Sequence, residues 1–200
     1  MNLLLFSIAL PLLAYLLGSV PFGLLITRIG TGQDIRKAGS GNIGATNVKR
    51  LMGTRWGVMT LALDISKGAI PTWAALCLSA GEASWLVGAT MLAAVCGHMY
   101  PAYLKFQPSG KGVATAGGCI LVTAPLASIV ALMTFIGMVR WTRRISAGSL
   151  SATAVLPPAV WFSTQNPALL APSLIIMVLI LHRHEDNIRR LARGSEPPFS

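Results

Sequence analysis

Long uncharged stretches dominate this sequence, and short segments rich in lysine and arginine separate them. One such stretch, residues 113–139, contains no Asp, Glu, Lys or Arg and is followed directly by Arg140, Arg143 and Arg144. Hydrophobic residues make up 54% of the chain and charged residues 11%, and the mean hydropathy is +0.65. A soluble domain of this composition would expose apolar patches that aggregate. The sequence therefore predicts an all-α integral membrane protein.

Seven apolar segments are candidates for membrane-spanning helices, and some of them are short or kinked. A span needs about 20 apolar residues. The first segment contains Pro11 and Pro21, which membrane helices tolerate at kinks. If 113–139 is not divided at Pro125 into two crossings, it becomes re-entrant or interfacial and five spans remain. Residues 1–200 form a single transmembrane domain without repeats. The candidate segments are about 3–29, 56–78, 85–103, 113–123, 125–139, 149–162 and 168–181.

Cations set the expected orientation. By the positive-inside rule, the basic segment 31–55 is cytoplasmic. The turn 81–84 has no cation and suits the outer face, whereas the tail 183–200 is rich in arginine and lies inside. With 113–139 divided in two, Arg143 and Arg144 also fall inside. We therefore expect seven crossings with the N-terminus outside and the C-terminus inside.

Charge and cysteine usage exclude other classes. A net charge of +10 and a pI near 10.4 would suggest nucleic acid in a soluble protein. Here the cations stand at the ends of apolar segments, where they meet lipid headgroups and anionic ligands, so no nucleic-acid partner is expected. Cys77, Cys96 and Cys119 lie in apolar stretches and fit buried small residues. No second ligand pair follows Cys96 and His98, so no metal site is expected.

The most distinctive polar segment runs from Gly39 to Arg50, with the sequence GSGNIGATNVKR. Small residues let backbone N–H groups turn toward an anion, as in phosphate-binding nests. Hydroxyls and amides add directed hydrogen bonds, and Arg50 can form a bidentate fork to phosphate. The segment therefore predicts a binding loop for a polar, anionic ligand.

Three further segments share this character and are expected on the same face. They are 97–115, 143–149 and 184–191, and each combines cations with small or hydrogen-bonding residues. Lys111 lies between two glycines at the start of a helical run, which favours anion binding at the helix N-terminus. The upstream glycine and the Ser/Thr of a P-loop are missing, so a nucleotide site is not indicated. Arg183 is interpreted as a charge that sets topology and meets lipid headgroups.

Charged residues within a span are rare and usually face the bundle interior. Asp64 and Lys67 are three residues apart and share a helix face. They are either a mutually neutralising structural pair or a supporting pair that positions a loop. His98 is either a buried, hydrogen-bonded residue or part of the site lining.

Three segments together resemble the signatures of the bacterial membrane glycerol-3-phosphate acyltransferases that use acyl phosphate as donor. They are 39–48, 110–115, and His184 with Asn187, Arg190, Gly194 and Glu196. The similarity covers nearly the whole chain, with Ser109 standing where the family usually has a glycine. We assign catalytic roles to Ser40, Arg50, His184 and Asn187. We assign substrate or phosphate contacts to Gly41, Asn42, Gly44, Ala45, Thr46, Asn47, Gly110, Lys111, Gly112, Ser146, Ser149 and Glu196.

The resemblance implies acyl transfer from acyl phosphate to the sn-1 hydroxyl of glycerol 3-phosphate, giving lysophosphatidic acid and phosphate. It implies seven spans, an active site on the cytoplasmic face of the bacterial inner membrane, and no metal, cofactor, acyl-CoA or acyl carrier protein. We expect a monomer whose partners are the two substrates and membrane lipid. The His-x4-Asp pair of acyltransferases with soluble donors is absent, since Tyr103, Asn187 and Arg189 stand five residues beyond His98, His182 and His184.

Such a reaction needs two bound phosphates, an oriented hydroxyl and stabilisation of the developing oxyanion. Acyl phosphate is already activated, so Ser40 is expected to position substrate without forming an acyl-enzyme. His184 and the substrate's own phosphate are both candidates for the general base. The alternative from another class is a small anion transporter or channel. It would place charges on both faces or at the midplane, and the cations here gather on one face.

Overall fold

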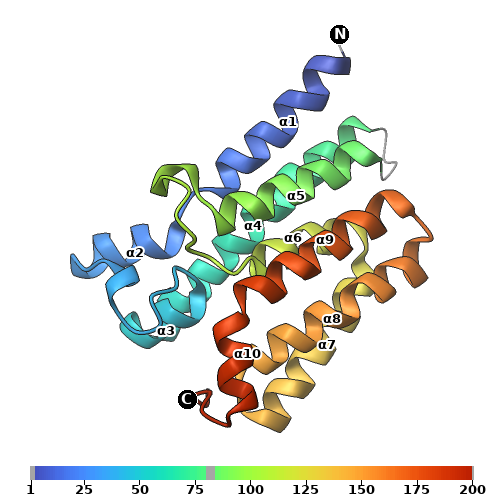
Figure 1. Ribbon diagram of the computed structural model, residues 1–200. Helices are drawn as coiled ribbons and strands as arrows, with labels where there is room; N and C mark the ends of the chain where they lie inside the picture. Colours follow the sequence, from blue (N-terminus) through green and yellow to red (C-terminus); the bar gives the residue numbers. More distant parts are fainter. Residues whose placement is uncertain (1–2, 80–83, 200) are drawn as a thin grey trace.

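A computed structural model of the chain describes residues 3–79 and 84–199, and these residues form helices joined by short connections (Figure 1). The predicted outer turn at 81–84 lies, except for Ser84, outside the described residues. The elements in chain order are α1 (Leu3–Gly18), α2 (Phe22–Thr31), η1 (Ile35–Lys37), α3 (Ala45–Met52), α4 (Thr54–Leu78), α5 (Trp85–Met99), η2 (Ala102–Leu104), α6 (Val113–Thr123), α7 (Pro125–Thr142), α8 (Ile145–Thr164), α9 (Pro167–Arg183) and α10 (Glu185–Ala192).

Each predicted apolar segment is helical, and two prolines explain the breaks. Pro11 is accommodated inside α1, but Pro21 divides the first predicted segment into α1 and α2. The predicted division of 113–139 is confirmed: α6 ends at Thr123, and Pro125 opens α7 as its first residue. Proline has no N–H to donate and its fixed φ suits the first turn, so it ends one helix and begins the next.

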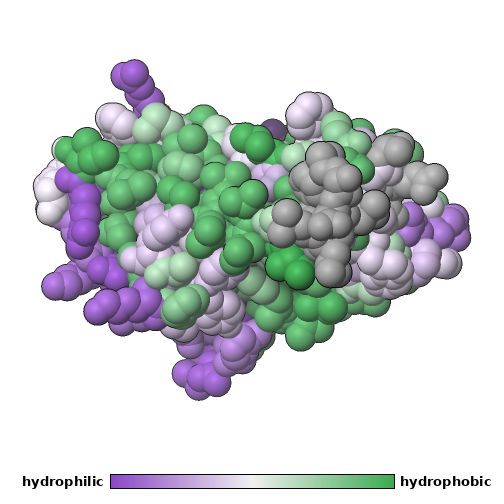
Figure 2. All heavy atoms as spheres, turned by 90° about the horizontal axis from the view of Figure 1, so that it is seen from above, coloured by the Kyte–Doolittle hydropathy of each residue, from purple (hydrophilic) through white to green (hydrophobic). Residues whose placement is uncertain are grey.

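Some of the predicted membrane-spanning segments are confirmed to be long and apolar enough to cross a bilayer. Four described segments, 7–31, 54–78, 125–142 and 145–164, are long and apolar enough to cross a bilayer, and α9 with α10 adds a fifth if this pair, bent by 61°, counts as one. Helices α5 and α6 have 15 and 11 residues, fewer than the about 20 that a full crossing needs. Figure 2 shows hydrophobic residues over much of the visible face, with hydrophilic ones gathered toward its edges. The integral membrane architecture is thus supported, whereas helix length does not fix seven crossings.

The helices pack in pairs, α1 on α5, α4 on α6 and α7 on α8. The α4–α6 pair is close because glycines face the partner backbone: a Cβ on Gly68 would overlap the carbonyl oxygen of Thr115, and one on Gly118 that of Ile65. Small residues are the usual means by which membrane helices approach each other. This contact places the N-terminal end of α6 beside the middle of α4.

Short helices gather at one end of the molecule. In Figure 1, α2, α3 and α10 lie on the side away from the start of α1 and the turn between α8 and α9. The expected polar loop 31–55 is in fact partly helical, since it contains η1 and α3. Apolar side chains explain this difference, because Ile35, Ile43 and Val48 are buried in a small core with α2.

Candidate active site

A pocket of about 740 Å³ opens at this end of the molecule. Four separated segments line it: 39–50, 108–114, 145–149 and 183–197. The first turns of α3, α6, α8 and α10 all contribute, so four helix N-termini surround the same space. Helix N-termini carry partial positive charge and unpaired N–H groups, and both favour an anion.

Asn47 determines the shape of the loop before α3. It is 1% exposed, and its Nδ2 donates to the carbonyl oxygens of Ala38 and Asn42, both at 3.0 Å. Its Oδ1 accepts from the backbone N–H of Ser40 at 3.0 Å. The carboxamide predicted to contact phosphate is therefore committed to the loop's own backbone. Gly39 has φ +59, and a Cβ there would overlap Asn47 Oδ1.

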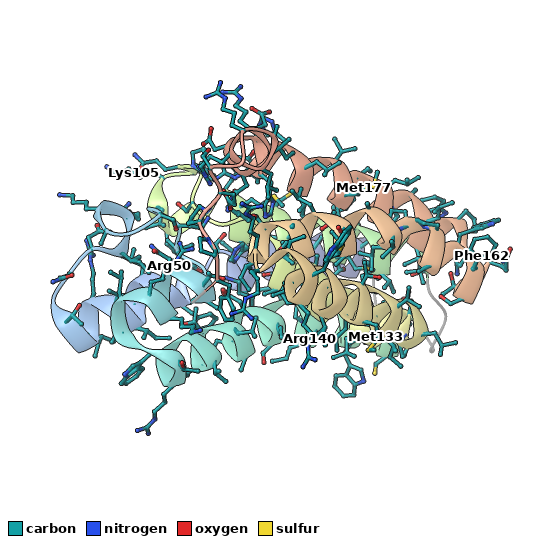
Figure 3. All side chains as sticks on the ribbon, turned by 90° about the horizontal axis from the view of Figure 1, so that it is seen from below. Arg50, Lys105, Met133, Arg140, Phe162 and Met177 are labelled. Carbon is teal, nitrogen blue, oxygen red and sulfur yellow. The ribbon has the colours of Figure 1, made fainter. Side chains whose placement is uncertain are left out.

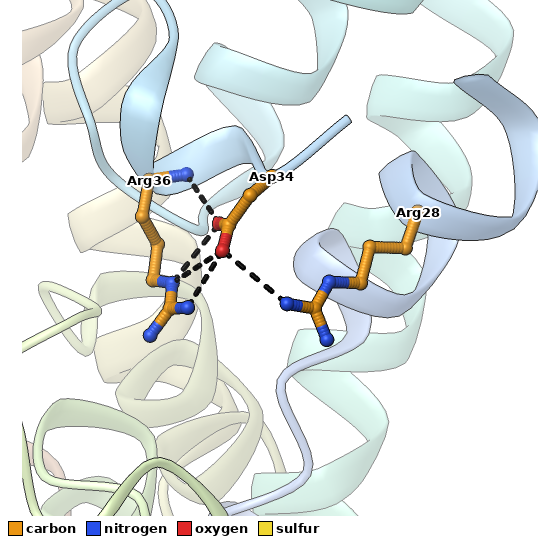
Figure 4. Close-up of polar contacts among 3 residues, drawn as sticks. All are labelled: Arg28, Asp34 and Arg36. Atoms are coloured by element: carbon orange, nitrogen blue, oxygen red, sulfur yellow. Dashed lines mark hydrogen bonds and ion pairs between the residues drawn. The ribbon is translucent and has the colours of Figure 1, made fainter. Parts of the chain in front are cut away.

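An ion-pair cluster fixes the chain just before this loop (Figure 4). Asp34 Oδ2 accepts from Arg36 Nη2 at 2.6 Å and from Arg28 Nη2 at 3.4 Å, and Asp34 Oδ1 accepts from the Arg36 backbone N–H at 3.0 Å. The hydrogen bonds from Arg36 hold the pKa of Asp34 well below its usual range. These three residues do not line the pocket, so their charges shape the loop from outside.

Arg50 ends the loop segment on the last turn of α3 and lines the pocket. Figure 3 shows it at the same end of the molecule as Lys105, with Phe162 at the other end. Among the described residues, no hydrogen bond or ion pair engages its guanidinium. Its five donors remain available to a ligand.

Lys111 is placed by the loop 108–112. The backbone N–H of Ser109 donates to Met99 O at 3.0 Å, and Arg183 Nε donates to Gly110 O at 3.1 Å. Gly112 has φ +83 and precedes α6. Lys111 Nζ then donates to Asn187 Oδ1 at 2.6 Å. Burial, together with nearby arginines, lowers the pKa of Lys111 to about 8.

The tail, residues 184–196, folds back against Lys111 and completes this side of the pocket. Asn187 Nδ2 donates to Glu196 Oε1 at 2.6 Å, and Arg190 Nε donates to Glu196 Oε2 at 2.6 Å. Burial raises the pKa of Glu196, but the neighbouring polar groups of Ser146, Asn187 and Arg190 outweigh this and leave it below its usual value. Arg144 Nε holds the same tail by donating to Glu196 O at 3.0 Å. Lys111, Asn187, Glu196 and Arg190 thus form one hydrogen-bonded chain.

His184 stands at the bend between α9 and α10, so no continuous helix face joins it to Asn187. Both residues nevertheless line the pocket. His184 Nδ1 lies 2.8 Å from Ile180 O. Because a carbonyl oxygen can only accept, Nδ1 carries the proton and Nε2 bears the lone pair. Burial and the charge of Lys111 lower the pKa of His184 to about 4, so the ring is neutral at pH 7.

The pocket collects the predicted site residues with two exceptions, Gly110 and Lys67. Gly110 lies behind Lys111 against His98, and Lys67 is buried beneath Asp64. The predicted residues that line the pocket are Ser40, Gly41, Asn42, Gly44, Ala45, Thr46, Asn47, Arg50, Asp64, His98, Lys111, Gly112, Ser146, Ser149, His184, Asn187 and Glu196.

The sequence interpretation missed Arg183, which it treated as a lipid-facing charge. The residue lines the pocket and holds the Lys111 loop. Its position directly before His184 was the available signal. Ser109 and Arg190 also line the pocket. In the part of the chain that the structure describes, no group of three or more His, Cys, Asp or Glu residues could hold a metal ion.

Comparison with known proteins gives consistent matches over nearly the whole chain. The sequence model of the family described as glycerol-3-phosphate acyltransferase matches residues 8–194. The glycerol-3-phosphate acyltransferase of Syntrophotalea carbinolica is 48% identical over 189 residues, which cover 94% of this chain and 95% of that one. That of Aquifex aeolicus is 39% identical over 193 residues, which cover 96% and 99%.

Solved structures agree with these relatives. The crystal structure of PlsY (YgiH), an integral membrane glycerol 3-phosphate acyltransferase, in its glycerol 3-phosphate form has a TM-score of 0.92 at 39% identity, covering 97% of this chain and 96% of that one. The lysophosphatidic acid form of that protein has a TM-score of 0.89 at 38% identity, covering 97% and 95%.

Proposed function

Since this chain belongs to the glycerol-3-phosphate acyltransferase family and is a membrane acyltransferase that makes lysophosphatidic acid, we propose that its pocket joins acyl phosphate to glycerol 3-phosphate. The acyl group passes to the sn-1 hydroxyl, and inorganic phosphate leaves. Because the chain belongs to an acyltransferase family, we prefer this function to the alternative of an anion transporter or channel.

One observation supports this assignment most directly: the three signature segments, far apart in sequence, line one pocket. Both substrates carry phosphate, and Arg50, Lys111, Arg183 and Arg190 bring positive charge to the lining. Arg50 and Lys111 approach from different walls, which suits two phosphates held side by side. Asn42 and Ser40 add neutral hydrogen-bonding groups to the same lining.

The chemistry follows from what the pocket offers. The sn-1 oxygen attacks the acyl carbonyl carbon, the new ester C–O bond forms, and the bond between that carbon and the phosphate oxygen breaks. Phosphate is a good leaving group, so no covalent enzyme intermediate is needed. Ser40 and the nearby backbone amides orient the reactants and stabilise the oxyanion. Cations held near the departing phosphate oppose its charge.

The proton of the attacking hydroxyl needs an acceptor. His184 presents Nε2 as a lone pair, but a pKa of about 4 makes it a weak base at pH 7. We assign it the role of accepting the hydrogen bond from the hydroxyl and orienting it. The phosphate of the substrate then receives the proton. Asn187 beside it can both donate to and accept from the same glycerol backbone.

The proposed topology has seven crossings, with the N-terminus outside and the pocket on the cytoplasmic side of a bacterial inner membrane. Charge distribution supports this orientation, because Arg50 and Arg190 line the pocket and Lys105 lies at the same end of the molecule (Figure 3). The short helices α5 and α6 cross with help from their flanking segments. The enzyme acts as a monomer, since one chain supplies every wall of the pocket.

The test is an assay of purified protein with glycerol 3-phosphate and acyl phosphate, followed by release of phosphate and formation of lysophosphatidic acid. We expect both products in equal amounts, and neither when glycerol 3-phosphate is omitted. Acyl-CoA offered in place of acyl phosphate should give no product. Intact-mass spectrometry of the working enzyme should find no acylated protein; an acyl group on Ser40 would overturn direct transfer.

A further inference from the structure

A buried charged cluster borders the pocket, with Asp64 and His98 in the lining and Lys67 behind Asp64, and the reaction described above does not use it. Asp64 and Lys67 on α4 and His98 on α5 are 2%, 1% and 4% exposed. Lys67 Nζ lies 2.7 Å from Asp64 Oδ1 and donates to Val20 O at 3.0 Å. His98 Nδ1 faces the same Asp64 oxygen at 3.6 Å and has no hydrogen-bond partner among the described residues. The cluster therefore joins the break between α1 and α2 to α4 and α5.

The imidazole of His98 also touches the Lys111 loop. A Cβ on Gly110 would overlap His98 Nε2 and Cδ2, so the ring edge lies directly against the bare backbone of this glycine. The residue after His98 holds the loop too, since Met99 O accepts from the Ser109 N–H at 3.0 Å. The C-terminal end of α5 is thus the surface on which residues 108–112 rest.

Energetics favour a geometric role for this cluster. A buried ion pair loses much of its attraction to desolvation, and apolar residues of similar volume often serve stability as well or better. Two charges buried beside the pocket therefore need a reason other than stability. Lys67 pairs with Asp64, and Asp64 faces Nδ1 of His98. Gly110 lies against Nε2 and Cδ2 of the same ring, so the ring lies between the ion pair and the loop.

We propose that His98, braced by the buried Asp64–Lys67 ion pair, is a positioning residue that seats the loop 108–112 and thereby aims Lys111 at the bound phosphate. The proposal rests on the proposed function for its effect on catalysis. It explains how Lys111 Nζ reaches Asn187 across the pocket from a loop that rests on the C-terminal end of α5.

The experiment compares His98→Ala, His98→Asn and the double variant Asp64→Leu/Lys67→Met with wild type. The double variant removes both charges together, so no unpaired charge is left buried to destabilise the fold. Its effect on the position of the loop can then be measured in a folded protein. Thr90→Val is the matched control, because Thr90 is a fully buried polar residue of α5 whose hydroxyl bonds Leu86 O away from the pocket. Melting temperature checks that each variant is folded.

Two readouts are taken. Amide hydrogen exchange of residues 107–112 should be faster in His98→Ala and in the double variant and unchanged in Thr90→Val, while exchange at 19–22 reports separately the lost bond to Val20. The kcat/KM of acyl transfer should fall at least tenfold in His98→Ala and in the double variant. His98→Asn, whose amide replaces the nitrogen that faces Asp64, should recover part of it.

The proposal is overturned if amide exchange at 107–112 stays as slow as in wild type in both His98→Ala and the double variant, whatever happens to activity. A kcat/KM within twofold of wild type in both variants overturns it as well. A wild-type enzyme that releases no phosphate would instead defeat the proposed function, and the exchange comparison would still decide whether His98 seats the loop.

Discussion

The loop 39–47 and the tail 184–196 face the same pocket, but different kinds of contact hold them. The loop is fixed from within nine residues, by Asn47 bonding the backbone of Ala38, Ser40 and Asn42. The tail has bonds of its own from Asn187 and Arg190 to Glu196. It is also fixed from far away, by Lys111 donating to Asn187 and by Arg144 donating to Glu196 O. The loop can therefore form with its own segment, whereas the tail takes its place only once the bundle is packed. Substitutions should reveal this difference.

The largest effect is expected at the end of the loop segment. Arg50→Ala removes the free guanidinium of the pocket while leaving the packing of α3 intact. Losing one charge-assisted contact to phosphate costs about 2 kcal/mol or more, which is a fall of about thirtyfold or more in kcat/KM. Arg50→Lys is the matched control and should keep part of the activity. Near-normal turnover of Arg50→Ala at low glycerol 3-phosphate would exclude this role.

Asn47→Ala tests whether the loop is held locally. The change leaves several backbone groups without partners, each costing about 1 kcal/mol or more, and the loop should lose its shape. We expect kcat/KM to fall by roughly tenfold or more, with faster amide exchange confined to 38–47. The tail should exchange as in wild type. Equal loosening of residues 184–196 would show that the two regions depend on each other.

Asn187→Ala tests the opposite region. It removes the partner of both Lys111 and Glu196, and we expect about a tenfold rise in the KM for glycerol 3-phosphate or a similar fall in turnover. The affinity for acyl phosphate should hardly change. A variant that weakens only acyl-phosphate binding would move Asn187 to the donor side, and unchanged kinetics for both substrates would make it structural.

The pH dependence should follow Lys111. Burial lowers its pKa to about 8, so the ammonium is present below pH 8 and is lost as the pH rises through this value. About a tenth remains charged at pH 9, so kcat/KM should fall about tenfold between pH 7 and pH 9. In Lys111→Arg the fall should disappear, because arginine stays protonated. A decline of the same size in both enzymes would assign it to another group.

The smallest effect is expected outside the pocket. Asp34→Asn weakens the cluster that precedes the loop, but Asp34 is near the surface and such pairs are worth about 1 kcal/mol or less. The kcat/KM should stay within about threefold of wild type, with added salt reducing the difference further. A loss as large as that of Asn47→Ala would mean that this ion pair, and not Asn47, sets the loop.

Prediction from the sequence succeeded where the signal is local. The division of 113–139 at Pro125 is confirmed and follows from residues that are neighbours along the chain; the segment 39–50, singled out in the same way, lines the pocket. It was less successful at Asn47, whose carboxamide turns into its own loop, and at Arg183, whose guanidinium reaches Gly110. Residue type indicates that a side chain can bind an anion, but not which partner reaches it first.

The sequence by itself determined that this protein is a helical membrane protein, where the segment 113–139 breaks and which family it belongs to, and it singled out polar segments that line the pocket. Hydropathy, proline geometry and glycine-rich loops act over a few residues, so they can be read along the chain. Only the tertiary structure decided that the first turns of α3, α6, α8 and α10 surround one pocket and that the ring of His98 lies against Gly110. These contacts join residues far apart in the sequence, and they exist only when helix packing brings the segments within hydrogen-bond or van der Waals distance.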